Sequence, residues 1–115
     1  MLKWYKKLYI GDNAKKKADV YMRKINQGKL LFDIYLITLA SNEKNLLDII
    51  SANQLLQKTV RKRCPMIVGL ANGYGEAVDL VRQIAEETYH RQNDADIRRY
   101  LKERLIEENE DGAGE

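Results

Sequence analysis

The chain has 115 residues, of which 44% are hydrophobic and 32% are charged, and its formal net charge is +3. This length and composition are typical of one globular domain with its own core, and they exclude a disordered chain. The longest apolar run, residues 34–40, is far shorter than the roughly 20 residues of a membrane-spanning helix. A single cysteine excludes an internal disulfide, and the basic start lacks the apolar stretch and cleavage site of a signal peptide. We therefore expect a cytoplasmic protein without a membrane segment.

The charges are distributed unevenly along the chain. Residues 1–29 carry nine Lys or Arg residues against two acids, whereas residues 76–115 carry six against twelve. This asymmetry predicts a basic face and an acidic C-terminal end, or complementary charges within a dimer. We expect residues 1–106 to form a single α/β domain. Residues 107–115, which are acidic and contain glycine, are expected to form a disordered tail.

The first predicted unit is a short strand followed by a helix. The strand covers residues 7–10 and ends at Gly11. Asp12 or Asn13 can cap the helix over residues 13–27, because their side-chain oxygens accept hydrogen bonds from its free N–H groups.

The second unit has the clearest pattern. Residues 31–40 are apolar over most of their length, which is typical of a central strand covered on both faces. Ser41 or Asn42 can cap a following helix, and Glu43 lies in its first turn, where the helix dipole favours an acid. Apolar residues at helical spacing continue to residue 57, so the sequence predicts a helix after this cap.

The third unit begins with a polar, basic connection over residues 58–65. A short strand over residues 66–71 and a glycine-rich turn lead to a long amphipathic helix over residues 74–91. A polar break then precedes a fourth helix over residues 96–106.

The order strand–helix–strand–helix–strand–helix–helix predicts an α/β fold with a small three-stranded, mainly parallel sheet in the order 1-2-3. The first two helices would cover one face of this sheet. The last two helices, or a second copy of the chain, would cover the other. Because three strands make a narrow sheet, we expect a homodimer.

Turns between strands and helices are the candidate ligand site. In a parallel sheet these turns open at one edge, where helix N-termini present free N–H groups to anions. The candidate ligand-binding residues are those of the three turns: Asp12, Asn13, Ser41, Asn42, Asn72, Gly73, Tyr74 and Gly75. Their glycine spacing matches neither a phosphate-binding loop nor a dinucleotide fingerprint. The same residue types also form turns and caps for local reasons alone.

The sequence contains no recognisable catalytic set. His90 lies at the end of the third helix, and Cys64 has no second cysteine or nearby histidine, so we expect an inert thiol. Ser41 lacks the sequence context of a nucleophilic serine. Metal-ligand spacing is absent as well. We therefore expect no catalytic residue, no bound metal and no cofactor.

Two segments, IYLITLASNEKNLLDIISANQLLQ and IVGLANGYGEAVDLVRQIAEETY, carry a resemblance that covers roughly residues 31–90. They resemble a group of small uncharacterised bacterial proteins of unknown function. The resemblance implies a bacterial cytoplasmic source and a compact α/β unit, and it transfers no functional residue.

Three functions remain open from the sequence. The leading hypothesis is a non-catalytic binding or protein-interaction module. An alternative is a binder or enzyme for a small anionic ligand, such as a nucleotide or phosphorylated metabolite, at the strand-to-helix turns. A second alternative is a nucleic-acid accessory protein, whose basic N-terminal face would hold a backbone while Trp4, Tyr5 and Tyr9 stack on bases.

Overall fold

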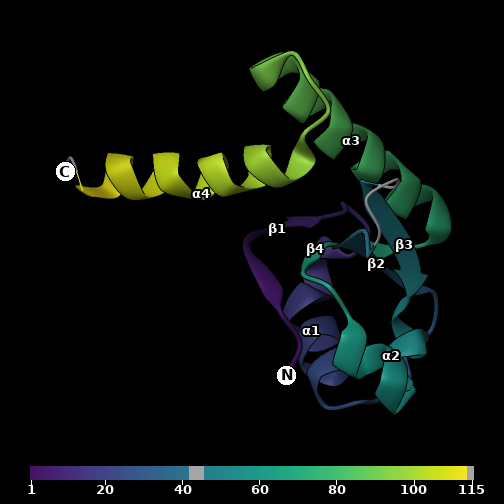
Figure 1. Ribbon diagram of the computed structural model, residues 1–115. Helices are drawn as coiled ribbons and strands as arrows, with labels where there is room; N and C mark the ends of the chain where they lie inside the picture. The colour runs from purple at the N-terminus through teal and green to yellow at the C-terminus, as the bar shows by residue number, and fades with distance from the viewer. Residues whose placement is uncertain (42–45, 114–115) are drawn as a thin grey trace.

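The computed structural model describes the backbone of residues 1–41 and 46–113 and the side chains of residues 1–41 and 46–106. It is an α/β protein in which a four-stranded mixed sheet lies between two layers of helices (Figure 1). The strands are β1 (Trp4–Ile10), β2 (Ile34–Leu39), β3 (Leu47–Ser51) and β4 (Ile67–Asn72). The helices are η1 (Lys15–Lys17), α1 (Ala18–Asn26), η2 (Ala52–Leu56), α2 (Lys58–Arg63), α3 (Tyr74–Gln92) and α4 (Ile97–Ala113).

The strands lie in the order β1-β4-β2-β3. Only β1 and β4 are parallel, and β2 pairs antiparallel with both β4 and β3. The predicted three-stranded, mainly parallel sheet in the order 1-2-3 is therefore wrong. The last predicted strand lies between the first two, and a further strand extends the sheet beyond β2.

That further strand, β3, replaces much of the predicted second helix. In the segment that contains it, the apolar residues fit both a helical and an alternating spacing. Pairing with β2 along the whole strand stabilises the extended conformation. It gives hydrogen-bond partners to backbone N–H and C=O groups and adds apolar surface to both faces of the sheet. Beyond the strand, the Asn53 side chain accepts from the N–H of Leu31 at 2.8 Å. The beginning of the predicted helix, residues 42–45, lies outside the described residues.

Strand β2 is an interior strand with both faces buried, as its continuous apolar run predicts. Ile34 and Leu36 pack on the side of α1, whereas Ile37 packs on the side of α3. The predicted connection over residues 58–65 contains the short helix α2.

The helices divide into two layers. Helix α1, η2 and α2 cover one face of the sheet, and α3 and α4 cover the other (Figure 1). The sequence left open whether the last two helices or a second copy of the chain covers the second face, and in the structure α3 and α4 cover it. A dimer is not needed to cover this face.

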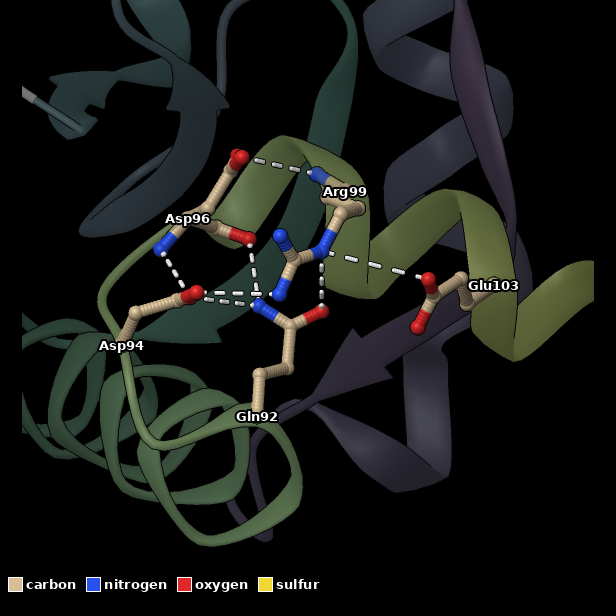
Figure 2. A network of polar contacts seen from close by, with 5 residues as sticks. All are labelled: Gln92, Asp94, Asp96, Arg99 and Glu103. Carbon is tan, nitrogen blue, oxygen red and sulfur yellow. Dashed lines mark hydrogen bonds and ion pairs between the residues drawn. The ribbon is translucent and has the colours of Figure 1, made fainter.

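The turn between α3 and α4 fixes the direction of α4. Helix α3 ends at Gln92, and Asn93 adopts a left-handed conformation with φ of 58°. Asp96 Oδ1 then accepts from the backbone N–H of Arg99 at 3.2 Å and caps α4, while the Arg99 guanidinium binds Asp94 at 2.9 Å (Figure 2). Helix α4 passes beside β1 and then extends away from the body (Figure 1). It continues through Ala113, beyond the expected domain boundary at residue 106.

Candidate functional site

Two of the three predicted turns lie together. Because β1 and β4 are parallel, both strands end at the same edge of the sheet, and the N–H of Gly11 donates to Leu70 O at 2.9 Å. Asp12 and Asn13 therefore lie beside the turn that follows β4, which contains the four candidate residues Asn72, Gly73, Tyr74 and Gly75.

A carboxylate of the chain itself lies between these two turns. Glu76, in the first turn of α3, accepts the backbone N–H of Asn13 at 2.7 Å and that of Asn72 at 3.0 Å. The helix dipole favours a negative charge at this position. Glu76 thus occupies the place where a bound anion would meet free N–H groups. This role of Glu76 was not predicted, although a glutamate three residues after a helix cap is a recognised capping signal.

Two glycines allow this arrangement. A Cβ atom at Gly11 would lie 2.0 Å from Glu76 Oε1, so the carboxylate can approach the turn only because residue 11 has no side chain. Gly73 precedes α3 with φ of 102°, a conformation that other residues rarely adopt.

The surroundings of Glu76 are acidic. A hollow of about 140 Å³ at this edge is lined by three carboxylates, those of Asp12, Glu76 and Asp79. Their charges repel a negatively charged ligand. Tyr74, also exposed at this edge, packs edge-on against Tyr35 with ring centroids 5.6 Å apart.

The third predicted turn lies at the other end of the strands. Ser41 follows β2, which is antiparallel to β4, so it lies near the beginning of β4 rather than its end. Asn42 lies outside the described residues. The expectation that all three turns share one edge is wrong, because it requires a parallel sheet.

Ser41 lines a cavity of about 440 Å³ between the sheet and α2. Its charged and reactive lining residues are Asp48, Arg63 and Cys64. Burial raises the pKa of the Cys64 thiol and outweighs the lowering effect of the nearby Arg61 guanidinium. The thiol also donates to Pro65 O at 3.3 Å, so it lacks the features of an activated nucleophile.

A second polar cluster joins α3 and α4 to β1. One carboxylate oxygen of Glu87 accepts hydrogen bonds from the hydroxyl groups of Tyr9 at 2.6 Å and Tyr100 at 3.1 Å. Burial and the bond to Glu87 raise the pKa of Tyr9. Burial also opposes the charge of Glu87, but the hydrogen bonds from Tyr9, Gln83 and Tyr100 outweigh it and lower the pKa of this carboxyl.

Arg104 completes this cluster at strand β1. Its guanidinium lies over the Tyr9 ring, 4.4 Å from the centroid, and donates to Lys7 O at 3.1 Å. Tyr5 OH donates to Leu101 O at 2.8 Å. The cluster therefore attaches α4 to the outer strand of the sheet.

The aromatic residues of the basic N-terminal segment face the interior. Tyr5 and Tyr9 are buried, and Trp4 packs against the core and donates from Nε1 to Asn26 at 2.9 Å. The rings of Tyr5 and Tyr9 are therefore not exposed for stacking on nucleic-acid bases, and the Trp4 ring is half-buried.

Strand β3 presents an open edge. Within residues 1–41 and 46–113, it pairs with β2 alone. The N–H of Ala40 donates to Leu46 O at 3.3 Å, and bonded and non-bonded pairs alternate along an antiparallel ladder. The backbone groups of Asp48 and Ile50 consequently bond to β2. Those that point away from β2 belong to Leu47, Ile49 and Ser51, and the Ser51 carbonyl is also the N-cap acceptor of η2.

The side chains along this edge are only partly covered. All residues of β3 are half-buried, and four of the five are Leu, Ile or Ser. Asp48 carries the one charge of the strand. This edge strand was not predicted, although the adjacent β-branched Ile49 and Ile50 are a signal for a strand.

His90 is exposed on the last turn of α3. Among the described residues, no three His, Cys, Asp or Glu side chains form a group that could hold a metal ion. No helix in this part of the chain has the length and apolar content to cross a membrane.

Comparison with known proteins adds no relative. No protein-family model, curated protein or solved structure matches the chain. The resemblance to small bacterial proteins therefore stays a prediction.

Proposed function

We propose that this protein is a non-catalytic protein-interaction module that binds an extended polypeptide by strand addition to β3. The observation that carries the proposal is the open β3 edge, where backbone groups of Leu47, Ile49 and Ser51 point away from β2. Strand addition uses such groups for affinity and alternating side chains for specificity. The half-buried residues of β3 give an added strand apolar surface on both faces.

The turn edge supports a ligand less well. The Glu76 carboxylate already accepts two backbone N–H groups there, and two further carboxylates surround it. Nucleic-acid binding is also less favoured, because Tyr5 and Tyr9 are buried and their hydroxyl groups donate hydrogen bonds to α4 and α3.

The absence of a disulfide partner for Cys64 favours a cytoplasmic location.

Selection from a random ten-residue peptide library displayed on phage tests this proposal. The wild-type chain is immobilised at low density, and Ile49→Pro serves as the edge-blocked variant. Proline at this position removes an N–H that points away from β2, so the ladder that holds β3 in the sheet stays intact. We expect peptides with alternating apolar or β-branched residues that lose at least tenfold in affinity for Ile49→Pro.

Phe32→Ser is the matched control, because Phe32 is 95% exposed and lies in the loop before β2. Selected peptides should bind this variant as tightly as the wild type. Peptides that bind Ile49→Pro and the wild type equally, or a selection without enrichment, would contradict the proposal.

A second candidate function is binding of a small anionic ligand, and the cavity beside Ser41 favours it. Its volume of about 440 Å³ lies within the range of small-molecule sites, and Arg63 supplies a positive charge. Thermal unfolding in the presence of nucleotides and phosphorylated metabolites tests this candidate. Stabilisation of the wild type that Arg63→Gln abolishes would support it. No shift with any of these compounds would exclude it.

A further inference from the structure

We infer that the polypeptide that occupies the β3 edge is a second copy of the chain, with the two β3 strands antiparallel about a two-fold axis at Ile49. The inference rests on the proposed function, since both use the same edge, and it identifies the partner. The pairing joins two four-stranded sheets into one continuous sheet.

The hydrogen-bonding pattern of β3 suits this self-pairing. The outward backbone groups belong to Leu47, Ile49 and Ser51, which are placed symmetrically about Ile49. In a two-fold arrangement centred there, Ile49 faces Ile49 of the second copy, and Leu47 faces Ser51. The Ile49 pair exchanges two N–H···O bonds, whereas in the Leu47–Ser51 pair the Ser51 carbonyl also accepts the first hydrogen bond of η2. Every outward group of the strand then has a partner.

The single charge of the strand selects this register over its neighbours. With the two-fold axis at Ile49, Asp48 of one copy lies opposite Ile50 of the other. With the axis at Asp48, the two Asp48 carboxylates would lie directly opposite each other, which destabilises a strand pair. Centred on Ile50, fewer residues of the strand overlap.

The faces of the two copies match in this arrangement. An axis perpendicular to the sheet leaves the α3 side of one copy continuous with the α3 side of the other. Leu47 and Ile49 lie on that side and are half-buried in a single chain. Contact between the copies therefore covers apolar surface that the chain leaves accessible.

Sedimentation velocity at protein concentrations up to about 100 µM tests the oligomeric state. We expect a dimer for the wild type and for Phe32→Ser, and a monomer for Ile49→Lys, because a lysine blocks an edge strand. A monomeric wild type, or a dimer that persists in Ile49→Lys, would overturn the inference. Circular dichroism verifies that each variant is folded.

A scan of single cysteines tests the register. In a Cys64→Ser background, Ile49→Cys, Asp48→Cys and Ile50→Cys are oxidised separately. In the proposed register the two Cα atoms at position 49 lie about 5.5 Å apart, within disulfide range. Those at position 48 are diagonal neighbours at about 7–8 Å. We expect at least tenfold more covalent dimer from Ile49→Cys than from the other two variants. The reverse result would overturn the register.

The two proposals fail in different ways. A monomeric chain that still selects extended peptides would refute self-pairing but leave strand addition intact. A dimer that forms through another surface, with no cross-link at β3, would also refute self-pairing. The peptide selection would then show whether β3 binds extended peptides.

Discussion

The two outer strands of the sheet, β1 and β3, are both edges, but only one of them is protected. Strand β1 carries Lys6 and Lys7 in its middle and has an irregular register against β4. Helix α4 passes beside it, and Arg104 donates to its backbone. Strand β3 has one charged residue, Asp48, a regular register and half-buried side chains.

Lysines, register irregularities and covering helices are the features by which proteins prevent unwanted pairing at an edge strand. Strand β1 has all three of these features, and we call it the closed edge. None of the three is found in the described part of β3, which is the open edge. The proposed strand addition therefore uses β3 and not β1. Four substitutions test it, in order of decreasing expected effect.

Leu101→Ala should give the largest effect, because it weakens the helix that covers β1. Leu101 is 4% exposed in the α3–α4 layer, and loss of such a side chain costs about 2–5 kcal/mol of unfolding free energy. Urea denaturation measures the change. The control is Ile106→Ala on the same helix, since Ile106 is 55% exposed and should change stability by less than about 0.5 kcal/mol. Equal costs for both variants would mean that α4 does not hold the closed edge.

Glu76→Ala should come next, because it detaches the end of β1 from α3. Two backbone N–H groups lose a charged acceptor, which costs about 1–3 kcal/mol. Thermal and urea unfolding measure the loss. Asp79→Ala is the matched control, since Asp79 lies on the same helix with an exposed side chain and should be nearly neutral. If Asp79→Ala cost as much, the effect would be one of helix charge and not of the two hydrogen bonds.

Glu87→Gln should have a smaller effect that depends on pH. The pKa of Glu87 is lowered from its ordinary value of 4.5 in the folded protein, so its charge stabilises the fold above pH 4.5. This contribution is lost as the pH falls below that value and the carboxylate binds a proton. We expect Glu87→Gln to lose about 1 kcal/mol near pH 7 and less at pH 3.

Urea denaturation across this pH range measures the effect of Glu87→Gln. Glu86→Gln, next to it and exposed, provides the comparison and should follow the wild-type pH profile. A cost of Glu87→Gln that does not change with pH would refute the role of the charge at the closed edge.

Asp48→Asn should have the smallest effect and sharpens the description of the open edge. It removes the charge of β3 and should change the stability of the single chain by less than about 0.5 kcal/mol. Because the two Asp48 side chains are diagonal neighbours in the proposed dimer, self-association should tighten by about twofold. Sedimentation velocity measures it, with Asp79→Asn as the control. A tenfold or larger gain would indicate that the two aspartates lie directly opposite each other.

Local sequence predicted the residues of the three turns, whereas their arrangement in space depends on pairing between distant segments. Asp12, Asn13 and Asn72 lie at one edge because the two strands before them, β1 and β4, are parallel, as predicted. Ser41 lies at the other end, because β2 is antiparallel to β4. The position of Glu76 between two turns depends on contacts 63 residues apart in the chain, and no local pattern encodes such a contact.

The sequence by itself determined that the chain is an α/β protein, that β2 is buried on both faces, and that a long helix, α3, follows β4. Each of these rests on composition and periodicity within one segment. Tertiary structure alone decided that Leu47–Ser51 is a strand and that β4 lies between β1 and β2. The physical reason is that the spacing of apolar residues indicates which side chains require burial. Which strands pair with each other depends instead on backbone hydrogen bonds to strands elsewhere in the chain. The open edge at β3, on which the proposed function depends, is therefore a property of the assembled sheet.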